Sequence, residues 1–599
     1  MRSDCAEQAL ARALRSDPVM GLTSALQIGR SALSASQVAI QVTGNNFANA
    51  ATPGYSRQIV SFNAIPDARL GSVFVGRGVE VSAIRRQVDT ALQARLWSGV
   101  SEEASASANY QVLSQVESTL NELTDNDLSS EFSRFFDAWS ELANSPNREG
   151  ARALVVNQGR TLASSIRSLR SDLIGVRNQV DSQLAATVDS ANKLLQQIAD
   201  VNAAVVQAEA GTGVSNSLRD QRDALIGQLS EFMDVSTVEQ ANGVIDVLVG
   251  STPVVLAGQN RGIELKKTTA GSELNVSINV KDDGTQLSVR SGSIGALLSQ
   301  RGSTIDRTID RLDDVAAQLV FEVNKVHSQG FGQTPLTSLR STRTVSTADT
   351  TLSLNDPSNL TFSALPFQAT NGGFLVTVRN QSTGAEQTVR IDVDLDGRDS
   401  TGAPGFGDDT SVASLATDLD NLPSVSATVN PDGTLSITTD QGFDVRFSDD
   451  SSGVLAVLGI NTYFTGKDAT DIDVRSDLVT QPGLLATGGY KGTDVVDNAA
   501  ALNIAALRDA KNPALSDRSI SGAWIDTAQS VGLDAAAASN RADATRLVRE
   551  NLESQRSAVS GVSVDEESIN LLSFQRQYQA SARFISAVDE MTQTLLSLI

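Results

Sequence analysis

The feature that most constrains the fold of this chain is a heptad pattern in residues 563–599. Ser563 and Glu566 form a capping-box pattern, in which each side chain bonds to the other's backbone amide, so we expect a helix to begin here. Alternating spacings of three and four then mark a mostly apolar series: Leu571, Phe574, Tyr578, Ser581, Ile585, Val588, Thr592, Leu595 and Ile599. This is the spacing of a coiled-coil seam. Such a helix needs a partner, either the other end of the chain or another copy.

A matching pattern lies near the N-terminal end. Apolar residues recur every seven positions at Leu26, Leu33, Ile40 and Phe47. A neighbouring stripe contains Ile28, Ala32, Ala35, Ala39 and Val42. A helix that is apolar on more than one face expects more than one neighbour. The two ends therefore either assemble with copies of the chain into a tube or close one long bundle.

Composition narrows the classes of function. The chain has 599 residues, a net charge of −23 and a pI near 4.5, which argues against nucleic acid or an anionic membrane as partner. It contains one cysteine, Cys5, and one histidine, His327, so neither a disulfide framework nor a multi-histidine metal site is expected. No apolar run approaches the roughly 18 residues of a membrane span. The first residues lack the apolar core of a signal peptide.

The periodicity predicts a multidomain α+β protein with terminal coiled-coil helices, a long-helix bundle and inserted all-β material. Residues 150–209 lack proline and nearly lack glycine, which predicts a helical rod of roughly 90 Å. Asn242-Gly243 and Asp283-Gly284 predict hairpins, and we expect Val73 and Val75 to face Val79 and Val81.

We divide the chain into eight segments. These are an N-terminal extension (1–19), an axial coiled-coil region with an Asn-rich turn and a short β excursion (20–104), a first helical segment (105–235), a β-hairpin segment (236–293), a central helix (294–334), an inserted β domain (335–470), a return segment with the last helical part (471–545), and the C-terminal axial helix (546–599).

A short motif follows the N-terminal pattern. It consists of Asn45, Asn46, Ala48, Asn49, Thr52, Pro53, Gly54, Tyr55 and Arg57. Pro and Gly at the two central positions of Thr52-Pro-Gly-Tyr predict a type II turn. The motif resembles the N-terminal signature of the flagellar axial proteins of the rod, hook and hook–filament junction. Within that family, residues 561–567 with Phe574, Tyr578 and Ala580 resemble the hook-associated members, as do Asp220-Gln-Arg-Asp223 and Asn324-x-x-His327-x-x-Gly330.

The resemblance implies an extracellular structural protein, not an enzyme, without cofactor and exported by the flagellar type III apparatus without a cleaved signal peptide. It would form the junction zone between hook and filament. Its partners would be copies of itself, hook protein, a second hook-associated junction protein and an export chaperone on the C-terminal helix. Alternatives are a hook or distal rod subunit, a secreted β-rich adhesin, or an enzyme carried on the central insertion. Family members begin close to the first seam helix, so we expect translation to start at Met20.

Three further features of the sequence are candidates for functional sites. Asp392, Asp394, Asp396 and Gly397 copy the opening of a calcium loop, but its twelfth position is Ala403 instead of Glu and Arg398 adds a positive charge, so we expect no metal there. His327 has no partner histidine or cysteine and is expected to be structural. Arg85-Arg86 is expected to lie on a solvated strand edge. No catalytic group is predicted.

Overall fold

The structure is a computed structural model that describes residues 4–70, 73–122, 127–211, 213–270, 273–492 and 494–597, without the side chains of residues 4–20, 70, 270, 273 and 274. Residues 1–3 of the expected extension, and Ile599 of the seam, lie outside this description. The chain divides into two compact units, the first made of residues 1–110, 182–298 and 538–599 and the second of residues 111–181 and 299–537.

Four helices contain residues of both units. They are α2 (Thr90–Leu120), α4 (Glu149–Glu209), α6 (Gly292–Gln300) and α13 (Ile520–Ser560). The 61 residues of α4 form one helix, as the sequence predicts, with apolar side chains buried at spacings of three and four. The expected boundaries after residues 104 and 545 fall inside α2 and α13. The eight-segment division otherwise stays a prediction.

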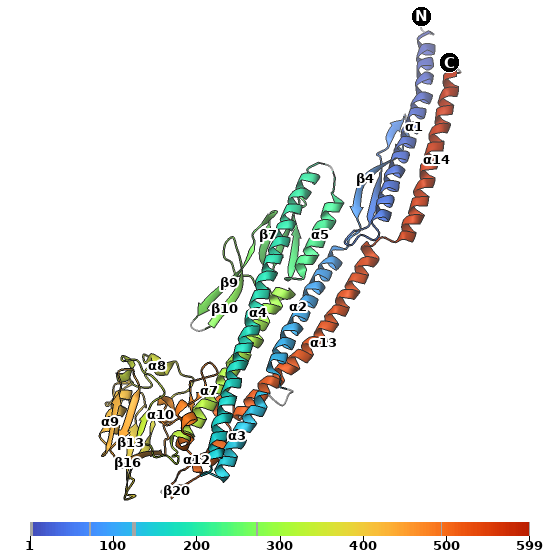
Figure 1. The fold of residues 1–599 in the computed structure, drawn as a ribbon. Coiled ribbons are helices and arrows are strands. Elements are labelled where there is room, and N and C mark those ends of the chain that lie inside the picture. Colours follow the sequence, from blue (N-terminus) through green and yellow to red (C-terminus); the bar gives the residue numbers. More distant parts are fainter. Residues whose placement is uncertain are drawn as a thin grey trace. The chain divides into compact units, whose positions relative to one another are not determined.

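The terminal helices form an antiparallel pair in the first unit. They are α1 (Asp4–Ala48) and α14 (Val564–Ser597), which lie side by side in Figure 1. A Cβ atom added to Gly29 would lie 2.7 Å from Cγ1 of Ile585. Further along α1, Asn46 contacts Glu567, which comes earlier in α14. The helices therefore run in opposite directions, and the predicted terminal coiled coil is confirmed.

A small sheet is the second neighbour of α1. Strand β1 (Gln58–Ala64) pairs with β4 (Val79–Arg86), and the amide of Val79 donates to the hydroxyl of Ser31 on α1 at 3.3 Å. Strand β2 (Ala68–Leu70) pairs with β3 (Val73–Val75). The expected pairing of 73–75 with 79–81 is therefore wrong, because the longer β1 gives β4 a more extended ladder.

The rest of the first unit contains α5 (Asn216–Ser230) and two antiparallel sheets. One has the order β5 (Val235–Glu239), β6 (Ile245–Val249), β7 (Thr252–Leu256), β8 (Gln259–Asn260), and the other pairs β9 (Ile263–Ala270) with β10 (Glu273–Val280). The predicted hairpin at Asn242-Gly243 joins β5 to β6, with Gly243 at φ +81°. Asp283-Gly284 instead closes a turn after β10 that returns to a single bridge between Asn279 and Gln286.

An aromatic core organises the second unit. It packs α3 (Leu128–Asn144), α7 (Arg307–Ser328) and α12 (Ala499–Ala506) together. Asp127 caps α3 by accepting from the amide of Ser130 at 2.7 Å. The core side chains without solvent exposure include Phe132, Phe135, Phe136, Trp139, Leu142, Tyr463 and Phe464. The last two come from the segment predicted as an insertion, so that segment belongs to the core of its unit.

The predicted central helix is interrupted. α6 (Gly292–Gln300) is followed by a π-helical turn (Arg301–Asp306) and then by α7. Arg301 is buried in this turn, and its guanidinium donates to Asp181 at 2.6 Å and to Asp306 at 2.9 Å. A π turn inserts an extra residue into the helix. Sequence periodicity did not predict it.

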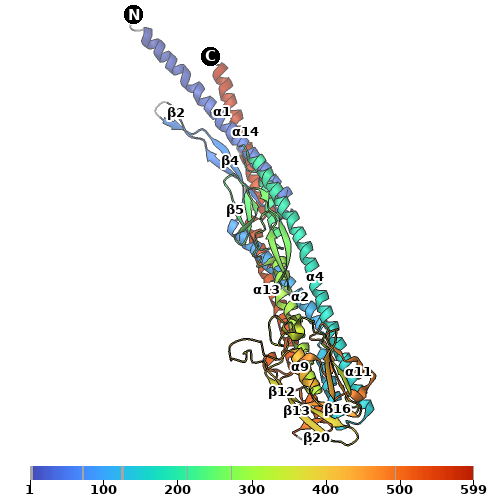
Figure 2. The ribbon, with the colours of Figure 1, turned by 90° about the vertical axis from the view of Figure 1, so that its left-hand side faces the viewer.

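The region 335–470 contains strands and also helices. Its two three-stranded sheets have the orders β11-β15-β14 and β13-β12-β16, and the three strands of the second lie together in Figure 2. The strands of this region are β11 (Ser338–Arg340), β12 (Gly372–Asn380), β13 (Glu386–Val393), β14 (Val425–Val429), β15 (Leu435–Thr439), β16 (Phe443–Ser448) and β17 (Phe464–Thr465). Three short strands follow after residue 470, namely β18 (Asp473–Val474), β19 (Gly489–Lys491) and β20 (Asp494–Val496). The helices of this region are α8 (Leu360–Ser363), α9 (Val412–Asp420) and α10 (Val454–Leu458), with a 3-10 turn at Asp349–Thr351. After residue 470 come α11 (Ser476–Thr480) and 3-10 turns at Pro482–Leu484 and Pro513–Leu515.

The all-β expectation for this region is therefore wrong. Helix α9 begins with a capping box between Ser411 and Ser414. It buries one apolar face, formed by Val412, Leu415, Ala416 and Leu419. Because turn residues are frequent around α9, the sequence did not indicate this short helix.

Candidate functional site

The motif after α1 forms the turn that the sequence predicts. Gly54 has φ +80°, and the amide of Tyr55 donates to the carbonyl of Thr52 at 3.2 Å. These are features of a type II turn with glycine at its third position. The end of α1 is closed locally, because the amide nitrogen Nδ2 of Asn49 donates to the carbonyl of Asn45 at 2.9 Å. The turn reverses the chain and leads into β1.

Asn46 lies at the centre of the motif and is 1 % exposed. Its Nδ2 donates to the carbonyl of Gln58 at 2.9 Å and to Oε2 of Glu567 at 3.0 Å. Its Oδ1 accepts from the amide of Gln58 at 3.0 Å and from the hydroxyl of Tyr55 at 2.9 Å. Both donors and both acceptor positions of one side-chain amide are used. No other side chain of this size offers two donors and two acceptor positions, which explains why an asparagine occupies this position.

Arg57 connects this turn to the start of α14. Its Nε donates to Oε1 of Glu567 at 2.9 Å, and its Nη1 donates to Oε2 of Glu566 at 2.8 Å. The amide of Arg57 donates to the carbonyl of Ser560, the last residue of α13, at 2.9 Å. Glu567 is 2 % exposed, so its charge is compensated by an arginine fork in a poorly hydrated place. Of the predicted capping box, Ser563 accepts from the amide of Glu566 at 3.4 Å, and the Glu566 carboxylate bonds to Arg57.

The same turn is tied to α5 by two acidic residues. The amide of Ser56 donates to Asp220 at 3.3 Å. Arg86, at the end of β4, donates to Asp220 at 2.9 Å and to Asp223 at 2.7 Å. Burial, with the negative charges of Asp220 and Glu567, raises the pKa of the Tyr55 hydroxyl to about 12, so it stays a hydrogen-bond donor. Arg86 is thus an ion-pair partner, so the expectation of a solvated strand edge is wrong for Arg86, whereas Arg85 is exposed.

We call this set of contacts the joint: Asn46, Tyr55, Ser56, Arg57, Arg86, Asp220, Asp223, Glu566 and Glu567. It fixes the end of α1, the α13–α14 connection and α5 to one another within the first unit. The sequence indicated Asn46, Tyr55 and Arg57 through the motif, and it indicated Asp220 and Asp223 through a separate one. That these motifs meet could not be read from their spacing.

The predicted seam residues differ in their surroundings. Val588 is buried, and half-buried side chains are Leu26, Leu33, Ile40, Leu571, Phe574, Ile585 and Leu595. On α1 the most buried positions are smaller, namely Ala35, Ser36, Ala39, Val42 and Thr43. Phe47 and Tyr578 remain 45 % and 37 % exposed, so the α1–α14 pair does not bury them. Their expected role in assembly stays a prediction.

His327 belongs to the core of the second unit. Its Nδ1 lies 2.8 Å from the carbonyl of Asn461, and its Nε2 accepts from the amide of Ala486 at 3.0 Å. These contacts require a neutral ring with the proton on Nδ1. Burial lowers the pKa of His327 to about 3. The structural role expected for this histidine is confirmed.

The calcium-like segment is arranged differently from an EF-hand loop. Asp392 pairs with Arg390 at 2.6 Å, outside the cluster that Asp394 and Asp396 form with Asp409. In that cluster one carboxylate oxygen of each aspartate lies within 4.8 Å of the others, and it is the one group of potential metal ligands found among the described residues. The third carboxylate therefore comes from a position that the loop scheme did not include.

Among the described residues, no helix is long and apolar enough to cross a membrane. Three family models match the chain. Residues 113–336 match the flagellar hook-associated protein FlgK helical domain, residues 553–598 match the flagellar basal body rod FlgEFG protein C-terminal, and residues 26–55 match the flagella basal body rod protein.

Individual relatives agree with these matches. Flagellar hook-associated protein 1 of Bacillus subtilis (strain 168) is 30 % identical over 51 % of this chain and 67 % of its own length. The Escherichia coli (strain K12) protein of the same name is 23 % identical over 96 % of this chain and its entire length. The solved structure of the flagellar hook junction protein FlgK from Burkholderia pseudomallei covers 78 % of this chain at 17 % identity, with a TM-score of 0.47.

Proposed function

The chain belongs to the flagellar hook-associated protein 1 family, and on this basis we propose that it is a structural subunit of the junction between hook and filament. In this proposal the subunits assemble through α1 and α14. Matches at both ends to rod-protein models support a place among the axial proteins, and the match over 113–336 favours a hook-associated member over a hook or rod subunit.

The single observation that carries the assembly role is the apolar surface that the terminal pair leaves exposed. On α14 it includes Ile569, Leu572, Tyr578, Phe584, Met591 and Leu596, and Phe47 adds to it from α1. Exposed apolar surface of this kind marks contacts with other proteins. Further copies of α1 and α14 would bury it in a ring of subunits, where the predicted seam residues meet.

We also propose the partners and the route. Hook protein and a second hook-associated junction protein would contact the two sides of the ring, and an export chaperone would cover α14 before assembly, because its apolar residues would otherwise be exposed. Export through the flagellar type III apparatus without a cleaved signal peptide would place the protein outside the cell. The role is structural and needs no catalytic group.

The test is the substitution Ile585→Asp. Ile585 is half-buried against Gly29, so the change removes about 1–2 kcal/mol of apolar burial per chain and places a carboxylate between two helices. The loss recurs in every subunit of a ring. We expect cells to export the variant, to grow hooks without filaments and to shed filament protein, as scored by electron microscopy and by analysis of the medium.

The control is Arg583→Asp, since Arg583 is exposed on the same helix. It should leave filaments in place. Normal filaments on Ile585→Asp cells would show that the seam is not an assembly interface.

A further inference from the structure

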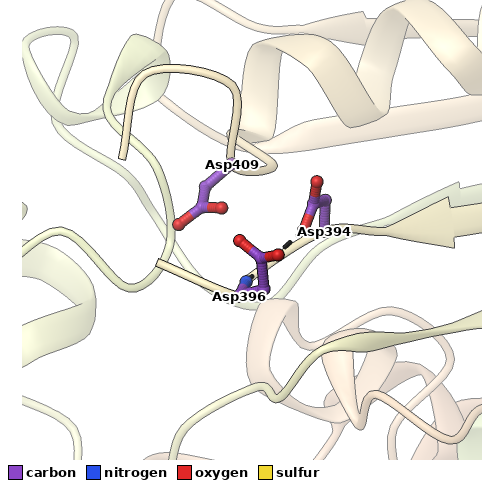
Figure 3. Close-up of side chains that lie close together, drawn as sticks. All are labelled: Asp394, Asp396 and Asp409. Atoms are coloured by element: carbon purple, nitrogen blue, oxygen red, sulfur yellow. Dashed lines mark hydrogen bonds between the residues drawn. The ribbon is translucent and has the colours of Figure 1, made fainter. Parts of the chain in front are cut away.

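Three aspartates from the two ends of one loop, residues 394–411 between β13 and α9, converge in the second unit (Figure 3). Asp394 and Asp396 follow strand β13, and Asp409 precedes helix α9. The two ends of this loop are joined by two hydrogen bonds, from the amide of Asp394 to the hydroxyl of Thr410 at 2.9 Å and from the amide of Thr410 to the carbonyl of Asp394 at 2.7 Å. This pairing brings Asp409 opposite Asp396, and Figure 3 shows one of its carboxylate oxygens turned toward the Asp396 carboxylate.

The two oxygens of Asp409 differ in their partners. Oδ2 accepts from Nδ2 of Asn355 at 2.7 Å and from the amide of Gly397 at 3.2 Å. Oδ1 is buried and accepts no hydrogen bond. The residue is only 5 % exposed, so this oxygen is also shielded from water. The side-chain oxygen of Asn355, whose Nδ2 bonds to Oδ2 of Asp409, is likewise buried without a donor.

These unpaired oxygens are a second observation beside the spacing of the three carboxylates. Buried polar atoms in folded proteins nearly always have a partner, and an ion is one of the partners that explains an exception. Here one buried acceptor without a donor belongs to Asp409 of the cluster, and the other belongs to Asn355, which is hydrogen-bonded to Asp409. Because all these groups are oxygen acceptors, a cation satisfies them, whereas another carboxylate or a carbonyl does not.

We propose that Asp394, Asp396 and Asp409 form a divalent-cation site that takes Ca²⁺, with the side-chain oxygen of Asn355 as a further ligand. The donor set is entirely oxygen, and the group contains no histidine or cysteine, as calcium prefers and zinc does not. The three carboxylates come from the two ends of one loop, and the variable geometry that results suits Ca²⁺ better than Mg²⁺, which demands a near-ideal octahedron. The bound ion cross-links the two ends of the loop between β13 and α9.

The experiment is calorimetric titration of the full-length monomer, stripped with a chelator, with CaCl₂ and separately with MgCl₂. We expect one Ca²⁺ site with a Kd on the order of 10⁻⁴–10⁻³ M, as in extracellular calcium modules, and weaker binding of Mg²⁺. Asp396→Asn should weaken Ca²⁺ binding about tenfold or more, because affinity depends on the charge of the ligands. Since Asp396 is exposed and asparagine can keep its bond to the amide of Arg398, this variant should fold.

Asp409→Asn is the second variant, and Asp408→Asn is the matched control. Asp408 is the exposed neighbour of Asp409 and changes the net charge equally. The site is supported if Asp396→Asn and Asp409→Asn lose Ca²⁺ binding while the Kd of Asp408→Asn changes by less than about twofold. Absence of a saturable Ca²⁺ signal in the unsubstituted protein, or equal weakening by all three substitutions, overturns the proposal.

Discussion

At the scale of single residues, the joint depends on side chains whose polar atoms are completely used. Asn46 makes four hydrogen bonds to three residues, and Glu567 is held between Asn46 and Arg57 in a place that water hardly reaches. Removing one member of a buried charged pair leaves the other uncompensated, which is more costly than losing an exposed pair. Two adjacent glutamates therefore differ in importance, because only Glu567 is buried.

We predict that Glu567→Ala opens the joint. The substitution leaves Arg57 and Asn46 without their shared acceptor and should cost about 2–4 kcal/mol locally. Hydrogen–deuterium exchange of the full chain should show faster exchange in residues 45–58 and 560–570. Glu566→Ala, which removes an exposed carboxylate, should change exchange there by much less. Equal effects of the two substitutions would contradict the assignment.

A pH dependence follows from His327. Its pKa is about 3 in the folded chain, against about 6.5 when unfolded. Above pH 6.5 the ring is neutral in both states, so it imposes no penalty. As the pH falls from 6.5 toward 3, only the unfolded state takes up the proton, and the free energy of unfolding falls by up to roughly 4 kcal/mol.

The chain contains a single histidine, so the prediction can be read directly. In ¹⁵N-histidine NMR spectra of the folded protein, the ring should remain neutral and protonated on Nδ1 down to about pH 4. A titration midpoint near 6.5 in the folded state would refute the buried neutral ring.

At the scale of elements, a glycine of α1, Gly29, allows α1 and α14 to pack closely against each other. A Cβ atom at Gly29 would lie 2.7 Å from Cγ1 and 3.5 Å from Cδ1 of Ile585, and 3.1 Å from a ring carbon of Phe584. The first of these distances is shorter than a carbon–carbon contact allows. Because isoleucine is branched at Cβ and stiff, Ile585 cannot turn away without cost.

We therefore expect Gly29→Ala to destabilise the pair, although alanine favours a helix by about 0.5–1 kcal/mol over glycine. Circular dichroism and hydrogen exchange of residues 570–595 should report the loosening. The double variant with Ile585→Ala should recover part of the loss, since it removes the clashing atoms. Gly44→Ala, on the same helix with open space around its Cα, should be neutral or stabilising. Stabilisation by Gly29→Ala would contradict the close packing.

At the scale of the whole molecule, each unit is assembled from separate stretches of chain. The first collects residues 1–110, 182–298 and 538–599, so its parts fold together only after most of the chain is present. The second includes the region 335–470, and this region is part of its core. The hydroxyl of Tyr463 donates to the carbonyl of Val155, and Asn461 accepts from His327.

Deletion of residues 335–470 should therefore unfold the second unit. It would expose Trp139 and its neighbours, which Tyr463 and Phe464 cover. We expect a red shift of tryptophan fluorescence and loss of near-ultraviolet dichroism. Insertion of two glycines after Thr383, in an exposed turn of the same region, should leave both signals unchanged. A native spectrum after the deletion would show that the region is a removable outer domain.

The sequence by itself determined the terminal helices, the long α4, the type II turn and the membership of the axial family, because each depends on local spacing or on a contiguous motif. The partners of β4, the π-helical turn at Arg301, the ion pairs of Arg86 and the cluster of Asp394 with Asp409 were decided only by the tertiary structure. Each of these joins residues that are distant in the chain or that compete for one partner. Local periodicity states which face of an element is apolar, but it does not state which other segment will cover that face.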